Sequence, residues 1–334
     1  MRSCLPAAVA ILSCLLAGES RALASQNGEE TFPRETQDDA WWTGPLLAAS
    51  AGALPQGHIL FEPYFFDSKP MRYVDAQGHS HPVADENEFG SFAYFLYGLG
   101  DGFTAGLIPR FGYNEGGPGK DSASIHLSDW TLQGQYQLTQ FHEGSPLPTI
   151  SFNVGETLPI GNFDRLDRPS DGFGTGAYTT ILSLYSQTYW WMPNGRIVRS
   201  RLNLSYALSG GVGLQGASVY GTGQEFIGHA RPSASLYGDL AFEYSISRNW
   251  VAALDFWLEQ DGNIRVEGTN ASGPGGGPES AATDSGVSQY LYLAPALEYN
   301  WSSTLGIIVG ARVFAWGHRE TALVTPVIAI NYVH

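Results

Sequence analysis

Strict alternation of apolar and polar side chains over residues 125–162 is the feature that most limits what this chain can fold into. In the first arm of this stretch one parity carries mainly Gln and Thr, and the other is apolar or small: Trp130, Leu132, Gly134, Tyr136 and Leu138. Because side chains along a strand alternate between two faces, one face of the predicted hairpin meets an apolar medium and the other a polar one. A soluble β-sandwich and a membrane β-barrel both contain such hairpins, so the other strands and their connections must distinguish them.

Segments of this kind follow one another after residue 57. They cover residues 58–66, 88–98, 103–113, 125–141, 149–158, 177–191, 196–208, 233–247, 250–259, 289–301, 305–316 and 322–334. Each is close to the length that a tilted strand needs to cross a bilayer. Tight turns such as Asp101-Gly102 alternate along the chain with long loops such as 209–232 and 260–288. This asymmetry predicts an all-β fold, a transmembrane antiparallel β-barrel of about 12 strands with short periplasmic turns and long extracellular loops.

The composition fits this prediction and excludes one class of partner. The chain has a formal net charge of -15, which makes nucleic acid an unsuitable ligand. Only 15% of the residues are charged and 13% are aromatic. The sequence beyond its first residues contains no apolar run long enough for a transmembrane helix. In lipid every backbone polar group needs a partner, so a sheet that spans the membrane has to close on itself.

The layout of residues 1–24 is that of a cleaved secretory signal peptide. Arg2 supplies the positive start, residues 5–17 form an apolar run, and an A-x-A cleavage site follows. Both cysteines, Cys4 and Cys14, lie inside this segment, so we expect no disulfide in the mature chain. A lipoprotein signal ending at Cys14 is the alternative, although its apolar run would be very short.

We expect residues 25–56 to form a separate segment ahead of a barrel made by residues 57–334. This segment is either a periplasmic tail or a luminal hatch that begins at Trp41 and Trp42. Pro109 interrupts the predicted strand 103–113, where it removes a ladder hydrogen bond and can kink the strand. It therefore marks a candidate lateral exit from the barrel.

The inward parity of successive strands carries charges of both signs together with aromatic rings. We take these residues as candidates for the lining of a substrate path: Arg110, Arg199, Arg201, Asp239, Glu243, Asp255, Trp257, Tyr290, Tyr292, Glu298 and Arg312. The alternative is that they form ion pairs and hydrogen bonds that fill a narrow lumen, because buried charges need partners whatever the function.

Short motifs spread over most of the mature chain carry a family resemblance. They are Trp42-Thr43-Gly44-Pro45, Leu54-Pro55-Gln56-Gly57-His58 with Glu62-Pro63-Tyr64, Leu127-Ser128-Asp129-Trp130-Thr131-Leu132, and Thr157-Leu158-Pro159-Ile160-Gly161. With these motifs the chain resembles the outer-membrane proteins grouped as the MetA-pathway of phenol degradation, or transporter, family, which is related to the long-chain fatty acid transporters. The resemblance implies a barrel of about twelve strands in the outer membrane of a Gram-negative bacterium. It also implies passage of small, often aromatic or apolar, compounds.

Several chemical motifs in the sequence do not amount to a site. Residues 211–216 match G-x-G-x-x-G, but no amphipathic helix follows them, so we expect no cofactor. His79 and His81 lie in an acidic loop, where solvation is expected in place of a metal site. His126 and Ser128 lie two apart on one predicted strand and are the basis of an alternative, a lipid-acting outer-membrane enzyme.

The sequence therefore predicts a channel that is not an enzyme and that conducts passive diffusion of small organic compounds. Its expected partners are outer-membrane lipid, lipopolysaccharide, the barrel-assembly machinery and a small-molecule substrate. A further alternative is a structural or adhesive barrel that binds an external partner through its long loops.

Overall fold

The computed structural model describes residues 33–84, 86–116, 120–271 and 277–334, so the predicted signal peptide lies outside the described residues. Arg34–His334 form one compact unit. Within the described ranges the regular structure consists of strands and two short 3-10 helices, η1 (Gln37–Asp39) and η2 (Pro169–Asp171). No helix in these ranges is long and apolar enough to cross a membrane.

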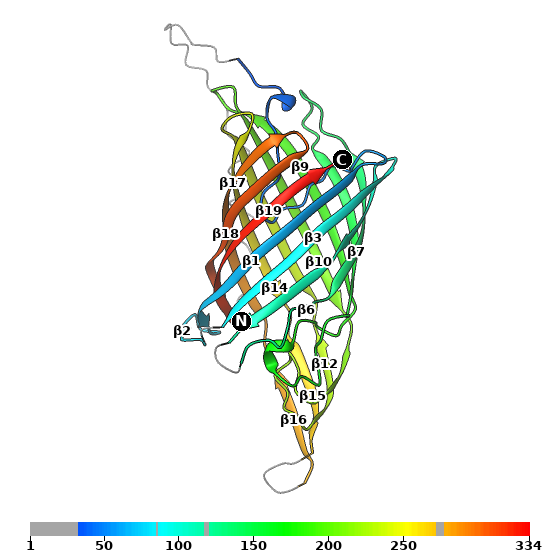
Figure 1. The fold of residues 1–334 in the computed structure, drawn as a ribbon, viewed down its shortest axis with the longest axis vertical. Coiled ribbons are helices and arrows are strands. Elements are labelled where there is room, and N and C mark those ends of the chain that lie inside the picture. Colours follow the sequence, from blue (N-terminus) through cyan, green and yellow to red (C-terminus); the bar gives the residue numbers. More distant parts are fainter. Residues whose placement is uncertain (1–32, 85, 117–119, 272–276) are drawn as a thin grey trace, which may run out of the picture. The chain divides into compact units, whose positions relative to one another are not determined.

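Antiparallel pairing closes one large sheet into a barrel (Figure 1). Strand β1 (Ile59–Val74) pairs with β19 (Glu320–Val333) on one side and with β3 (Asn87–Gly100) on the other. Strands β4 (Phe103–Ile108) and β5 (Arg110–Glu115) both pair with β3 and together fill one position in the wall. The other wall strands are β7 (Trp130–Thr139), β8 (Thr149–Leu158), β9 (Thr179–Trp191), β10 (Ile197–Ser209), β13 (Ser235–Ser245), β14 (Trp250–Asp261), β17 (Ser288–Ser302) and β18 (Leu305–His318). The described wall thus has twelve strand positions, which confirms the predicted antiparallel barrel.

The two faces of the wall differ as the alternation predicts. On β10, Leu202 and Leu204 are 39% and 47% exposed on the outer face. Arg199, Arg201 and Asn203 on the same strand are at most 7% exposed and face the interior. An apolar outer surface and a polar interior are the arrangement required of a barrel that sits in lipid.

Glu156 is a charged residue on the outward parity of β8 and is therefore an exception to this pattern. It pairs opposite Leu132, and no register shift separates β7 from β8 around it. The hydroxyl of Thr180 on the neighbouring strand donates a hydrogen bond to Glu156 at 2.7 Å. Because Glu156 lies two residues before the end of β8, it occupies the long-loop end of the outer surface, and no bulge is needed to explain it.

Pro109 separates β4 from β5 without breaking their pairing with β3. Ala93 donates its backbone N–H to the carbonyl oxygen of Pro109 at 3.2 Å, and the register is the same on both sides. The missing N–H of Pro109 falls on the other side, where the partner changes from β7 to the short strand β6 (His126–Leu127). There Ser128 donates to the carbonyl oxygen of Arg110 at 3.0 Å. Hydrogen bonds therefore flank Pro109 on both sides, and a lateral exit at this point stays a prediction.

The first and last strands meet at the short-turn end of the barrel. His334 donates its backbone N–H to Ile59 at 2.9 Å and accepts the N–H of Ile59 at 3.0 Å. An even number of wall positions requires both ends of the barrel sequence to lie at the same end of the wall.

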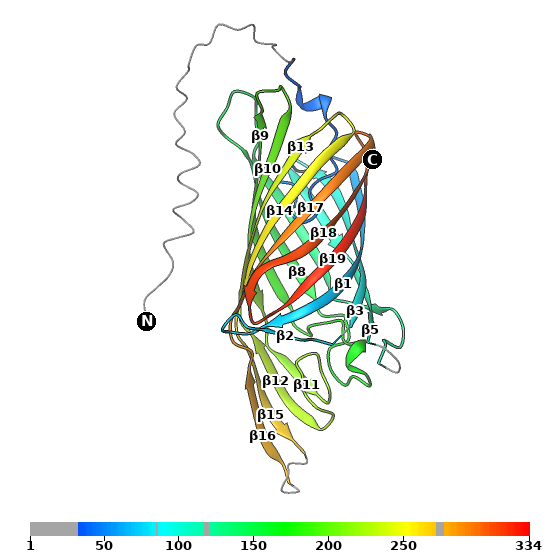
Figure 2. The ribbon, with the colours of Figure 1, turned by 90° about the vertical axis from the view of Figure 1, so that its left-hand side faces the viewer.

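The predicted long loops 209–232 and 260–288 contain strands that the sequence analysis did not identify. They contribute β11 (Val212–Gln215), β12 (Phe226–Pro232), β15 (Ile264–Asn270) and β16 (Glu279–Asp284), which form a separate four-stranded sheet at the long-loop end (Figure 2). Its core is a cluster of buried apolar side chains: Ala177, Val212, Leu214, Phe226, Ala230 and Val266. Residues 272–276, between β15 and β16, lie outside the described residues.

Candidate functional site

Residues 41–55 cross the interior of the barrel, and we call them the luminal segment. Of the two placements predicted for the region before the barrel, the structure has the luminal one for these residues. Leu46, Ala48 and Ala51 are at most 4% exposed. The segment has no regular structure, so its backbone N–H and C=O groups need partners from the wall.

Asp255 on β14 is the main anchor of the luminal segment. Its carboxylate accepts the backbone N–H groups of Leu46 at 3.1 Å, Leu47 at 3.2 Å and Ala48 at 3.1 Å. Three consecutive N–H groups that converge on one carboxylate form a charge-assisted anion nest. Asp255 was predicted to line a substrate path, but here its carboxylate binds backbone N–H groups of the same chain.

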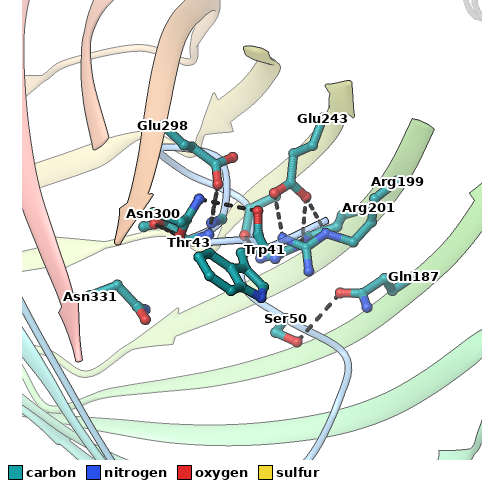
Figure 3. Close-up of polar contacts among 12 residues, drawn as sticks. Trp41, Thr43, Ser50, Gln187, Arg199, Arg201, Glu243, Glu298, Asn300 and Asn331 are labelled. Atoms are coloured by element: carbon teal, nitrogen blue, oxygen red, sulfur yellow. Dashed lines mark hydrogen bonds and ion pairs between the residues drawn. The ribbon is translucent and has the colours of Figure 1, made fainter. Parts of the chain in front are cut away.

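Glu298 on β17 is a second anchor of the same kind. It accepts the backbone N–H of Thr43 at 2.7 Å and of Gly44 at 3.2 Å (Figure 3). Next to it, Asn300 accepts the hydroxyl of Thr43 at 2.9 Å and donates to the carbonyl oxygen of Trp41 at 3.1 Å. Both ends of this short stretch are thus fixed to one strand of the wall.

Inward polar side chains from the opposite strands complete the attachment. Arg201 donates to the carbonyl oxygen of Ala48 at 2.8 Å, and Asn203 donates to that of Ala49 at 3.1 Å. Four further wall residues bind the backbone of residues 50–54. Gln135 and Ser151 donate hydrogen bonds to its carbonyl oxygens, and Gln137 and Thr104 accept its N–H groups. These four residues were not predicted as site residues, and their inward parity was the only signal that could have found them.

Two glycines in the wall make room for the luminal segment. A Cβ atom at Gly98 would lie 2.0 Å from the carbonyl oxygen of Pro55. A Cβ atom at Gly306 would lie 2.1 Å from the hydroxyl oxygen of Thr43. The segment therefore approaches the wall, through the backbone of Pro55 and the side chain of Thr43, at points where no larger residue fits without displacement.

Arg199, Arg201 and Glu243 form a buried ion-pair cluster beside the luminal segment (Figure 3). Arg199 and Glu243 are directly opposite in the β10–β13 ladder, and two nitrogens of Arg199 donate to the carboxylate of Glu243. The Nε atom of Arg201 lies 3.3 Å from the same carboxylate. The guanidinium of Arg199 also lies 4.6 Å above the ring of Trp42. For these three residues the geometry is that of a structural ion pair that packs on the segment.

A cavity of about 370 Å³ remains beside the luminal segment. Of the predicted path residues, Arg110, Arg199, Arg201, Asp239 and Trp257 line it, and the aromatic side chains Tyr64, Tyr94, Tyr185 and Tyr237 join them. The rings of Tyr237 and Trp257 are stacked, with their centroids 4.9 Å apart. A cavity of this size with mixed polar and aromatic walls is typical of a small-molecule site.

The remaining predicted path residues form a group away from this cavity. The hydroxyl of Tyr290 donates to Asp261 at 2.9 Å, and that of Tyr292 donates to the carbonyl oxygen of Thr321 at 3.1 Å. The guanidinium of Arg312 lies 4.7 Å from the centroid of the Tyr292 ring. The predicted set is thus divided among the segment anchors, the buried ion-pair cluster, the cavity wall and this further group.

The proposed His126 and Ser128 pair does not have the geometry of a nucleophile and its base. The Nε2 atom of His126 lies 3.0 Å from Asp171, and its Nδ1 atom lies 3.3 Å from the side-chain nitrogen of Asn162. Both ring nitrogens are therefore engaged, and neither contacts the hydroxyl of Ser128 among the described contacts. A base must be within hydrogen-bond reach of its nucleophile.

His79 and His81 gather around one carboxylate in the loop after β1. The Nε2 atom of His81 lies 2.8 Å from Asp75, which also accepts the backbone N–H groups of Gln77 at 2.9 Å and His79 at 2.8 Å. Among the described residues no group of three or more His, Cys, Asp or Glu side chains is arranged to hold a metal ion. The cluster is a loop closure built on Asp75.

This closure has a testable pH dependence. The hydrogen bond from His81, aided by the backbone N–H groups of His79 and Gln77, lowers the pKa of Asp75 to about 2. The unperturbed pKa of Asp is about 3.9, so the stabilising contribution is fully present above that value and is lost as the pH falls through about 2. A carbon-13 NMR titration of the Asp75 carboxyl should show this low midpoint, and His81→Ala should raise it. A midpoint near the unperturbed value in the unmodified protein would contradict the assignment.

Solved structures resemble this chain more clearly than known sequences do. No protein-family model and no curated protein sequence matches it. The crystal structure of the COG4313 outer membrane channel from Pseudomonas putida F1 matches with a TM-score of 0.63 and 13% identity, over 86% of this chain and 98% of that one. The TodX monoaromatic hydrocarbon channel deltaS2 mutant gives a TM-score of 0.41 and 13% identity, over 88% and 94%. The toluene transporter TbuX of Ralstonia pickettii gives 0.39 and 10%, over 88% and 95%.

The first of these similarities establishes the fold. This chain has the fold of an outer-membrane β-barrel, which is the fold expected from the sequence motifs. The other two structures are too distant to support more than this.

Proposed function

We propose that this protein is an outer-membrane channel for the passive diffusion of small organic compounds, and that its narrowest part is the cavity beside the luminal segment. The barrel fold and the apolar outer face support a position in the outer membrane. We extend the proposal to compounds with an aromatic or apolar body because aromatic rings line the cavity. The protein's role in this proposal is to provide a path, and it includes no chemical reaction.

The observation that carries the proposal is the combination of an anchored segment and a remaining cavity. The luminal segment fills much of the interior, yet it leaves about 370 Å³ bounded by Arg110, Asp239, Tyr237 and Trp257. If the inward side chains and the luminal segment served only to fill the barrel, we would expect no space of this size, because protein interiors are usually close-packed. A lined constriction that a small solute can enter is what a selective channel requires.

Planar-bilayer recording of the refolded protein tests this function. We expect a small, steady ion current that decreases when a small aromatic solute is added, because the solute and the ions share the lined constriction. The control is folded protein lacking the luminal segment, which should conduct more. The proposal fails if neither the complete barrel nor the segment-deleted barrel carries current, since the wall would then enclose no path.

The four-stranded sheet favours a second role in addition to this one. One long loop contributes β11 and β12 and another contributes β15 and β16, so two long loops form ordered structure at the long-loop end of the barrel. Residues of β16 are largely exposed, so one edge of this sheet is accessible. An exposed strand edge can pair with another chain, which is the feature an adhesive barrel would use.

A further inference from the structure

We propose that the cavity beside the luminal segment binds a small organic cation, a primary ammonium attached to an aromatic body, with the ammonium held by Asp239. This inference rests on the proposed channel function and names the class of compound that the channel prefers. It is carried by the arrangement of hydrogen-bond acceptors in the cavity wall.

Asp239 is a buried carboxylate that accepts no hydrogen bond from the residues that the structure describes. Its side chain lines the cavity, and the residue is 1% exposed. Both of its carboxylate oxygens are buried and have no hydrogen-bond partner among the described residues. Burial without a donor disfavours the charged form of this carboxyl group, and a cationic donor that reached it from the cavity would stabilise that form.

Two amide side chains in the lining of the same cavity, those of Asn203 and Asn153, also have an oxygen without a hydrogen-bond partner among the described residues. Asn203 pairs directly opposite Asp239, and its amide nitrogen is already used to donate to Ala49. The amide nitrogen of Asn153 donates to Gln133 at 3.2 Å and to the hydroxyl of Tyr185. These bonds fix the orientation of both amides, and both amide oxygens are left buried without a partner.

The other carboxylates near the cavity do not compete for a cation. Asp255 and Glu298 accept backbone N–H groups of the luminal segment, and Glu243 binds two guanidinium groups. Glu62 accepts the amide of Asn331 at 3.1 Å. Asp239 is thus the carboxylate of this group with both oxygens unsatisfied.

A primary ammonium matches this wall better than other small donors. It carries three N–H groups and one positive charge, so it offers the carboxylate of Asp239 both hydrogen-bond donors and a counter-charge. The stacked pair of Tyr237 and Trp257 supplies aromatic faces that attract a cation and pack against an aromatic body. The net charge of -15 on the whole chain also raises the local concentration of cations.

The guanidinium of Arg110 also lines the cavity, and this positive charge would favour an anionic ligand over a cationic one. It lies 5.2 Å from the centroid of the Phe92 ring, and no carboxylate lies within ion-pair distance of it among the described contacts. If Arg110 governed selection, an aromatic carboxylate would be preferred over an aromatic ammonium. The experiment therefore compares both charges on the same ring.

Isothermal titration calorimetry of the folded protein in lipid nanodiscs tests the inference with benzylammonium, benzyl alcohol and benzoate. We expect benzylammonium to bind at least about tenfold more tightly than the other two compounds, a ratio that corresponds to roughly 1.4 kcal/mol. Equal binding of benzyl alcohol, tighter binding of benzoate, or no binding of benzylammonium would each overturn the proposal. Because this assay measures binding and not current, its failure is distinct from failure of the channel function.

Asp239→Asn isolates the residue responsible. We expect this variant to lose the preference for benzylammonium over benzyl alcohol, while Glu156→Gln retains it. The control makes the same acid-to-amide change on the outer face of the wall, away from the cavity. A preference that survives in folded Asp239→Asn protein would contradict the assignment. The ligand series on the unmodified protein remains decisive if that variant does not fold.

Discussion

Deletion of residues 41–54 is expected to raise the single-channel conductance of the refolded barrel several-fold. The luminal segment occupies the interior through backbone hydrogen bonds to Asp255, Glu298, Arg201 and Asn203. Without it, a barrel with twelve wall positions keeps a polar interior that water and ions can enter. Planar-bilayer recording of both proteins under the same conditions measures the ratio.

The control for this deletion separates an open path from a damaged wall. The deletion leaves Asp255 and Glu298 without their N–H donors, so we would combine it with Asp255→Asn and Glu298→Gln. The same two substitutions in the full-length chain weaken the anchors without removing the segment. We expect the current through this full-length variant to fluctuate between the conductance of the unmodified protein and that of the segment-deleted protein. An unchanged conductance in folded, segment-deleted protein would show that the segment does not restrict the path.

Glu243→Gln is expected to lower the free energy of unfolding by about 3–5 kcal/mol. Glu243 is 0% exposed and receives the guanidinium groups of both Arg199 and Arg201. The substitution leaves two buried positive charges facing a neutral amide, and the loss of a buried partner is much more costly than the loss of an exposed one. Urea unfolding of the protein in lipid vesicles, followed by tryptophan fluorescence, provides the measurement.

Glu35→Gln serves as the matched comparison. Glu35 pairs with Arg196 at 2.5 Å, but the side chain of that arginine is 37% exposed. Solvent screening limits such a pair to about 1 kcal/mol or less. Similar losses in the two variants would mean that the Glu243 cluster is not a buried ion pair in the folded barrel.

The wall of this protein could be predicted from sequence because its physical rule is local. Residues such as Leu202 and Leu204 must meet lipid, and their neighbours Arg201 and Asn203 must not, so period-two alternation identifies each strand. The strands of the second sheet are shorter and contain glycines such as Gly228 and Gly268. Their alternation was too weak to distinguish them from loops.

The interior could be predicted only as a set of candidates. Parity alone indicated that Asp255, Glu298 and Glu243 face inward, but not which of them bind the luminal segment and which bind arginine. That division depends on register, which places Arg199 opposite Glu243. It also depends on the path of a segment with no periodicity of its own, whose conformation is set by donors and acceptors distant in the sequence.

The position of the luminal segment also constrains the order in which the barrel can be assembled. The segment comes directly before β1, whereas its two carboxylate anchors lie on β14 and β17, more than two hundred residues later. Its two carboxylate anchors are therefore absent until most of the wall has been synthesised. Pairing of β1 with β19 closes the longest loop in the chain and carries the largest closure entropy, so it is expected to form late. The wall then seals around a segment already lying inside, and nothing has to be threaded through a finished pore.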